Sequence, residues 1–249
     1  MGTYENKLLL ETHETNPALY LDGSGFGYGR GTKNGELVVQ PVNGYVSARQ
    51  GRRFGAITVP TTAAAGVAGH PAPVLFEGVK PFLYFNNNYA AATKKQCELA
   101  RLRLQYTAIG AGGTLPRYHM ELEPAGTNRY TSGGTQITPA GVNSDVSDLS
   151  SVVLFHGAVV APVASANVRR IQTGQIRPVI PVIFDDVTFV FGDQPAVAPS
   201  ILSGTAVASQ VIKVPPVIVG PQASFLLHLW RVSQSGADSL EVTMEWDER

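Results

Sequence analysis

The C-terminal segment, residues 224–249, carries the pattern that most restricts how this chain can fold. In its last part, apolar and polar side chains alternate with a period of two, which places them on opposite faces of a β-strand. The apolar set is Leu240, Val242, Met244 and Trp246, and the polar set is Glu241, Thr243 and Glu245. Residues 225–232 form a denser apolar run, typical of a strand buried on both faces, and residues 233–238 supply a turn. The pattern predicts that this end of the chain is tied into a sheet of a closed β-sandwich or barrel, built mainly as a scaffold.

The composition favours a β domain with a surface of low charge. With 249 residues, the chain can form one large β domain or two small ones. Its 26 glycines and 17 prolines fit many short strands joined by turns. Only 15% of the residues are charged, and 19 basic residues balance 19 acidic ones. This neutrality argues against broad nucleic-acid binding, which needs many cations, and it permits copies of the chain to associate without electrostatic repulsion.

Signals for secretion or membrane insertion are not evident. Residues 1–17 lack the basic start and the apolar run of a signal peptide, and no apolar run approaches the length of a membrane helix. Cys97 is the only cysteine, so a disulfide within the chain is impossible. This is compatible with a reducing cytoplasm and equally with an exterior protein that lacks disulfides. We therefore expect no contact with a membrane.

The N-terminal residues 1–35 have the composition of an extended arm. Glycine occupies every second position from residue 23 to residue 31. A segment of this kind is flexible alone and is expected to order against a partner or a neighbouring subunit. The spacing excludes the G-x-G-x-x-G frame of a dinucleotide site. We expect an arm at residues 1–35 and a β domain at residues 36–249.

Within the β domain, alternation and turn signals predict about nine or ten strands. Two of the clearest strands alternate apolar residues with polar or charged ones, at positions 100–107 and 117–123. If these two strands pair, their charged side chains favour the pairing modestly. The expected partners are Arg101 and Arg103 on one strand, and Glu121 and Glu123 on the other.

Two further segments are expected to form structures other than strands. Residues 89–99 contain good helix formers and neither glycine nor proline, which predicts one or two helical turns with Cys97 on the buried side. Residues 124–150 are polar and rich in Gly, Ser, Thr and Asn, which predicts a long loop or a binding excursion.

No residue constellation predicts catalysis or metal binding. The five histidines are far apart in sequence, so local zinc patterns are missing, and a Gly-x-Ser-x-Gly motif does not occur. Cys97 is best explained as a buried structural residue. Asp185 and Asp186 are adjacent, so they point to opposite faces of a strand and are expected at a hairpin turn or bulge. We expect no catalytic residue, no cofactor and no metal site.

The C-terminal segment resembles a class of tailed-bacteriophage virion proteins, most strongly over residues 215–249 and in the ending Trp246-Asp247-Glu248-Arg249. The glycine-rich stretch that follows residues 16–22 has a similar character. Proteins of this class are often jelly-roll domains that cement, decorate or spike the capsid, commonly as trimers. The resemblance implies an all-β, jelly-roll-like β-sandwich with an extended N-terminal arm.

The expected function is therefore that of a non-enzymatic virion structural protein, a cement or decoration protein of a phage head. Its expected partners are other copies of itself in a homo-oligomer, a trimer by resemblance, and the major capsid protein or another virion protein. We expect no nucleic acid or membrane as partner, and a location in the virion after assembly in the host cytoplasm. The expected partner-binding residues are Phe26, Tyr28, Arg30 and Trp246.

One alternative is a carbohydrate-binding β-sandwich, either alone or as the host-facing part of a virion spike. Its ligand surface would be formed by residues 86–89 and 124–150, with Tyr89 and Tyr130 against the sugar. A third possibility, a cupin-type enzyme, requires a cluster of His and Glu metal ligands, and the scattered histidines argue against it.

Overall fold

The computed structural model describes residues 30–31, 37–38, 47–58, 76–125, 129–145, 149–161, 164–176, 180–192 and 209–249. The chain divides into two units, Met1–Val46 and Ser47–Arg249. The predicted arm, residues 1–35, lies outside the described residues except for Arg30 and Gly31, so its boundary stays a prediction. In the first unit, the described residues form one short antiparallel pair, β1 (Arg30–Gly31) with β2 (Leu37–Val38).

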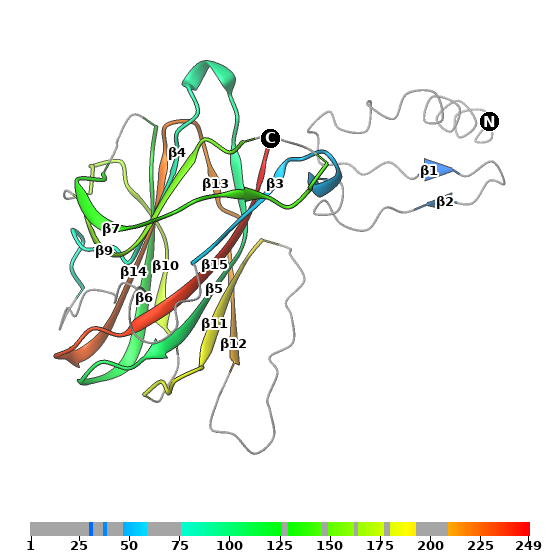
Figure 1. Cartoon of the computed structure of the whole chain (residues 1–249). Helices are drawn as coiled ribbons and strands as arrows, with labels where there is room; N and C mark the ends of the chain where they lie inside the picture. The colour runs from blue at the N-terminus through cyan, green and yellow to red at the C-terminus, as the bar shows by residue number, and fades with distance from the viewer. Residues whose placement is uncertain are drawn as a thin grey trace, which may run out of the picture. The chain divides into compact units, whose positions relative to one another are not determined.

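The second unit is an all-β sandwich of two sheets, as expected from the sequence (Figure 1). The strands of the seven-stranded sheet are, in spatial order, β12 (Ser209–Val214), β11 (Asp186–Phe191), β5 (Cys97–Ala108), β15 (Ser239–Glu248), β3 (Arg53–Ile57) and β8 (Ala140–Gly141), with β13 (Ile218–Val219) also paired to β5. The strands of the six-stranded sheet are β10 (Arg169–Gln175), β6 (Gly112–Glu123), β14 (Ser224–Gln234), β4 (Leu83–Asn87), β9 (Val152–Val160) and β7 (Ser132–Ile137). Among the described residues, no helix is both long and apolar enough to cross a membrane.

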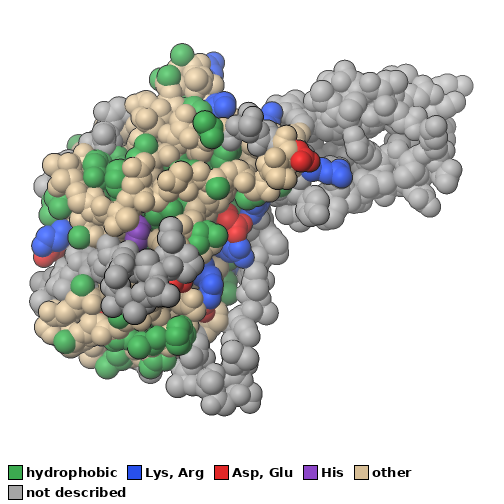
Figure 2. All heavy atoms as spheres, viewed as in Figure 1, with side chains coloured by type: hydrophobic (Ala, Val, Ile, Leu, Met, Phe, Trp, Pro, Cys, Tyr) green, Lys and Arg blue, Asp and Glu red, His purple; other side chains and the backbone are tan. Residues whose placement is uncertain are grey.

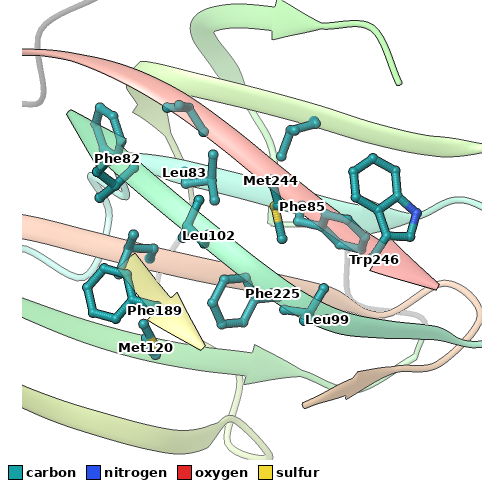
Figure 3. Packing of buried hydrophobic residues seen from close by; sticks show 14 of the residues in the cluster. Phe82, Leu83, Phe85, Leu99, Leu102, Met120, Phe189, Phe225, Met244 and Trp246 are labelled. Carbon is teal, nitrogen blue, oxygen red and sulfur yellow. The ribbon is translucent and has the colours of Figure 1, made fainter. Parts of the chain in front are cut away.

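The C-terminal strands lie at the centre of the two sheets, one in each. The predicted alternation in β15 is confirmed, because its four apolar side chains are fully buried while Glu241, Thr243 and Glu245 are half-buried on the other face. Trp246 stacks on Phe54 at 6.2 Å between ring centroids and meets Phe85 edge-on at 5.2 Å. Figure 3 shows Trp246 and Phe85 between the sheets, together with Leu102, Met120, Phe189 and Phe225. Burying large apolar side chains of this kind is the main favourable term that holds two sheets together.

The turn before β15 crosses from one sheet to the other, because β14 and β15 belong to different sheets. The turn between β5 and β6 crosses in the same way, and the two turns touch through backbone hydrogen bonds from Ser235 and Gly236 to the carbonyl of Ala111, both of 3.0 Å. The close approach requires glycine at position 110, since a Cβ there would lie 2.2 Å from the carbonyl oxygen of Gly236.

A buried ion pair fixes these two turns to each other. Arg231 donates from Nε and Nη2 to the two carboxylate oxygens of Asp238, at 2.9 and 2.6 Å, and both side chains are almost fully buried. The same guanidinium donates to the carbonyl of Gly110 at 2.7 Å, and the amide of Gly110 donates to Asp238 at 2.7 Å. Bidentate, charge-assisted pairing of this kind satisfies groups that would otherwise be costly to bury.

One sequence prediction about secondary structure is confirmed only in part, and another is wrong. The predicted helical turns at residues 89–99 are limited to a 3₁₀ segment, Ala91–Thr93, because Lys94 takes a left-handed conformation and Cys97 begins β5. The predicted long loop at residues 124–150 contains strands β7 and β8. The β7 strand has a bulge between Gly133 and Thr135, which hides the period of two in the sequence.

The predicted pairing of Arg101 and Arg103 with Glu121 and Glu123 is also wrong. Because the turn after β5 crosses to the other sheet, β5 and β6 are not neighbours. Arg101 instead pairs with Glu245 on β15. Arg103 pairs with Asp186 on β11, with 2.7 Å between Nε and the carboxylate.

Candidate functional site

The outer face of the six-stranded sheet carries a cluster of buried charged and titratable side chains. The period of two along β6 places His119, Glu121 and Glu123 on this face, and all three are buried. Arg129, from the segment after β6, lies fully buried between the two carboxylates. Its Nη1 atom is 2.8 Å from Oε2 of Glu121 and 3.1 Å from Oε1 of Glu123. We call these residues, together with His228 of β14, the buried charge cluster.

The two histidines of the cluster face Glu121 from neighbouring strands. His119 and His228 are opposite each other in the register of β6 and β14. Nε2 of His119 lies 3.1 Å from Oε1 of Glu121, and Nε2 of His228 lies 3.7 Å from Oε2. Burial lowers the pKa of His228, so its imidazole is neutral at neutral pH. Burial raises the pKa of Glu121, but contacts with His119, His228 and Arg129 outweigh burial and hold the pKa well below its usual range.

The cluster fastens several segments to the sheet. Nη2 of Arg129 donates to the carbonyl of Gly78 at 2.7 Å, which ties down the segment before β4. Ser165 donates twice to Glu123, from its backbone amide at 3.1 Å and from its hydroxyl at 2.6 Å. Phe76 covers the histidines, with its ring edge-on to His119 at 4.9 Å and to His228 at 5.1 Å.

The hydrogen bonding of the cluster indicates a structural clamp. Each oxygen of Glu121 and of Glu123 has a donor or a cation within 3.1 Å, from His119, Arg129 or Ser165. Within the described ranges, no group of three or more His, Cys, Asp or Glu side chains is arranged to hold a metal ion. The arrangement holds two buried carboxylates in hydrogen bonds and ion pairs, and through them it fastens loops to the sheet.

Another buried carboxylate, Glu248, lies at the end of β15. It accepts hydrogen bonds from the hydroxyls of Tyr89 and Ser150, and from the indole of Trp246 at 3.1 Å. Burial and the hydrogen bond to this carboxylate raise the pKa of Tyr89 to about 12. Burial also raises the pKa of the fully buried Cys97 thiol, which keeps it protonated and unreactive.

The structure does not bring together the residues predicted to bind a partner. Phe26 and Tyr28 lie outside the described residues, and Arg30 begins strand β1 of the first unit. Trp246 was expected at a partner contact, and this is corrected: the side chain has no exposed surface, because it fills the core between Phe54 and Phe85.

The two tyrosines of the carbohydrate-binding alternative lie in different parts of the sandwich. Tyr89 bonds to Glu248 at the end of β15. Tyr130 stacks on Phe155 with 4.2 Å between ring centroids, on the outer face of the six-stranded sheet. Within residues 86–89, the side-chain amide of Asn87 is also engaged, since it donates to the carbonyls of Lys95 and Val219 at 2.9 Å each.

The sequence reasoning missed Arg129, which is central to the buried charge cluster. The available signal was the pair of glutamates two residues apart on a strand, since two carboxylates on one buried face require a nearby cation.

Comparisons of the chain with protein-family models, with curated proteins and with solved structures find no match.

Proposed function

We propose that the sandwich is a jelly roll, and that the protein is a non-enzymatic structural component of a phage particle, a cement or decoration protein of the head. The observation that carries the proposal is the order in which eight of the strands pair. In chain order these strands are β3, β4, β5, β6, β10, β11, β14 and β15.

The eight strands pair in a nested pattern. The first strand pairs with the last, the second with the seventh, the third with the sixth and the fourth with the fifth. The pairs are β3–β15, β4–β14, β5–β11 and β6–β10, and all are antiparallel. This nesting matches a jelly roll, in which a folded ribbon of strands wraps around a common core, an architecture that recurs in viral capsid and lectin domains.

Two other features support a structural role. The chain has a separate N-terminal unit, Met1–Val46, which would attach the sandwich to a capsid protein or another virion protein. The buried ionic groups, the Arg231–Asp238 pair and the buried charge cluster, are engaged in fastening turns and loops. Ion pairs that hold turns and loops in place are compatible with a rigid domain that keeps its conformation in a large assembly.

The carbohydrate-binding alternative is less well supported. Its two proposed contacts, Tyr89 and Tyr130, have their rings or hydroxyls engaged within the chain. A sugar platform needs an exposed aromatic face, and stacking of Tyr130 on Phe155 uses one face of that ring.

The proposal is tested on particles produced from a genome that lacks the gene for this chain. Purified full-length chain is added, and particles are recovered by sedimentation. We expect the full-length chain to sediment with the particles, and a variant without residues 1–46 to remain folded by circular dichroism but stay in the supernatant. Absence of the full-length chain from the pellet overturns the proposal, and glycan-array binding without particle binding favours the alternative.

A further inference from the structure

We infer that Phe76 is an acid-sensitive cover over the two histidines of the buried charge cluster, and that it moves away from the sheet when His228 takes up a proton. The inference rests on the geometry of the cluster and does not depend on the proposed function. It starts from a contrast between the members of the cluster. Both carboxylates are bonded to donors or cations, whereas the imidazole of His228 has no hydrogen-bond partner among the described residues.

The imidazole of His228 is buried with both ring nitrogens unbonded. The residue is 2% exposed, and the carboxylate oxygen that faces it, Oε2 of Glu121, is 3.7 Å from Nε2, beyond the usual hydrogen-bond distance. On the face of the molecule in Figure 2, the described histidine side chains expose only a small area. A neutral imidazole is less costly to bury in this way than an imidazolium, whose charge would lack a hydrogen bond.

The carboxylates near His228 are already bonded to other groups. Oε1 of Glu121 lies 3.1 Å from Nε2 of His119, and Oε2 lies 2.8 Å from Nη1 of Arg129. Glu123 is bonded to the same arginine, at 3.1 Å. A proton on His228 would add a positive charge near that arginine, on a ring whose centroid is 6.0 Å from that of His119. Burial outweighs the attraction of Glu121 and lowers the pKa of His228, as this arrangement requires.

Titratable groups on the surrounding elements do not compensate a charge on the buried imidazole. Glu77 and Lys80, on the segment before β4, pair with each other at 2.7 Å. Arg117 on β6 and Arg170 on β10 are exposed, so solvent and salt screen their charges. On β4, burial raises the pKa of Tyr84, so its hydroxyl is uncharged at neutral and acidic pH. The balance of charge around the imidazole is therefore set within the buried charge cluster itself.

Phe76 is the part of this enclosure that moves at least cost. Its ring packs edge-on against both imidazoles and lies 5.5 Å from that of Trp230, between centroids. The residue is nevertheless 42% exposed, so it loses little buried surface when it moves. The hydrogen bond from Arg129 to the carbonyl of Gly78 fixes the chain two residues further on. Displacement of Phe76 therefore brings water to His228 while this bond and the strand pairing of β6 with β14 persist.

Protonation and displacement of Phe76 are linked. An imidazolium gains more from contact with water than from an aromatic ring in a closed site. The open form, with Phe76 displaced, therefore binds the proton near the ordinary histidine pKa of about 6.5, whereas the closed form holds the imidazole neutral. Between about pH 6.5 and the lower pKa of the closed form, each unit of acidification shifts the equilibrium about tenfold toward the open form. The cover is closed at neutral pH and opens in mild acid.

The test measures how strongly acrylamide quenches the tryptophan fluorescence of the full-length chain, from about pH 7 to about pH 4.5, above the ordinary range of carboxylate titration. The chain has two tryptophans, and Trp246 is fully buried, so a change in quenching reports on Trp230 beneath Phe76. We expect the quenching constant to rise as the pH falls below about 6.5, toward the value that Phe76→Ala shows at neutral pH. The far-UV circular dichroism should stay unchanged over this range.

Substitutions of two buried histidines assign the effect to one of them. His228→Leu fills the site with a side chain that does not titrate, so we expect a low quenching constant at every pH. His228→Gln has the same expected result and serves if the apolar side chain prevents folding. The matched control is His156→Leu, because His156 is also a buried histidine but packs against Phe82 on another part of the sheet. This control should keep the pH-dependent rise of the wild-type chain.

Four results overturn the inference. The first is a quenching constant of the wild-type chain that does not change with pH, and the second is a rise that persists in the folded His228 variants. The third is a rise that coincides with loss of the circular dichroism signal, which would mean unfolding of the whole sandwich. The fourth is a Phe76→Ala variant that matches the wild-type chain at neutral pH, which would mean that Phe76 does not cover this site.

Discussion

Among residues outside the apolar core, Arg129 is the one whose substitution should lower the free energy of unfolding most. Its guanidinium is fully buried and lies within 3.1 Å of both Glu121 and Glu123. In Arg129→Met, the side chain keeps an apolar stem of similar length, but two buried carboxylates lose their cation. Breaking a buried ion pair by removing one partner costs about 3–5 kcal/mol. We expect a loss of this size in the free energy of unfolding, measured by urea denaturation, and a melting temperature lower by about 10 °C.

The control is Arg169→Met on β10, where the side chain is exposed, and we expect a change of less than about 0.5 kcal/mol. A triple variant, Arg129→Met with Glu121→Gln and Glu123→Gln, separates charge from packing. If uncompensated charge causes the loss, the triple variant should recover a large part of it, because its buried groups are neutral. An Arg129→Met variant within about 1 kcal/mol of wild type would refute the reasoning.

Three further predictions concern buried groups. Trp246→Ala should lower the free energy of unfolding by about 3–5 kcal/mol in chemical denaturation, because it empties the core contact with Phe54 and Phe85; a loss below about 1 kcal/mol would contradict the packing described. Burial lowers the pKa of His156 to about 4, so the unfolded chain binds its proton first as the pH falls. The free energy of unfolding should therefore keep the full contribution of the neutral imidazole above about pH 6.5 and decrease by at most about 3 kcal/mol toward pH 4. In His156→Leu, the free energy of unfolding should vary less over this pH range; an unchanged profile would exclude His156 as the cause. The Cys97 thiol should react with a thiol reagent only under unfolding conditions, and rapid labelling of the native protein would contradict its burial.

The sequence was sufficient for the fold class where local pattern and tertiary burial agree. The alternation from Leu240 to Trp246 predicted a strand with one buried face, and the structure buries that face completely. The alternation at residues 100–107 likewise predicted the buried side of β5, with Leu102 and Leu104 in the core. In both strands, a period of two reports directly on which side faces the other sheet.

The sequence was insufficient where tertiary contacts decide. Residues 89–99 have helix-forming side chains, but pairing of Cys97 with Val219 and Glu248 overrides that local preference. The pairing partners of Arg101 and Glu121 depend on which turns cross between sheets, and a turn sequence does not specify this. Arg129 belongs to a polar segment whose composition gives no sign that its side chain is fully buried.

The composition of purified particles tests the central claim most directly. Quantitative mass spectrometry of phage particles produced from the genome that encodes this chain would measure its copy number relative to the major capsid protein. A cement or decoration protein predicts a fixed, high copy number that survives further purification. Particles that contain none of the chain would contradict a structural role in the virion.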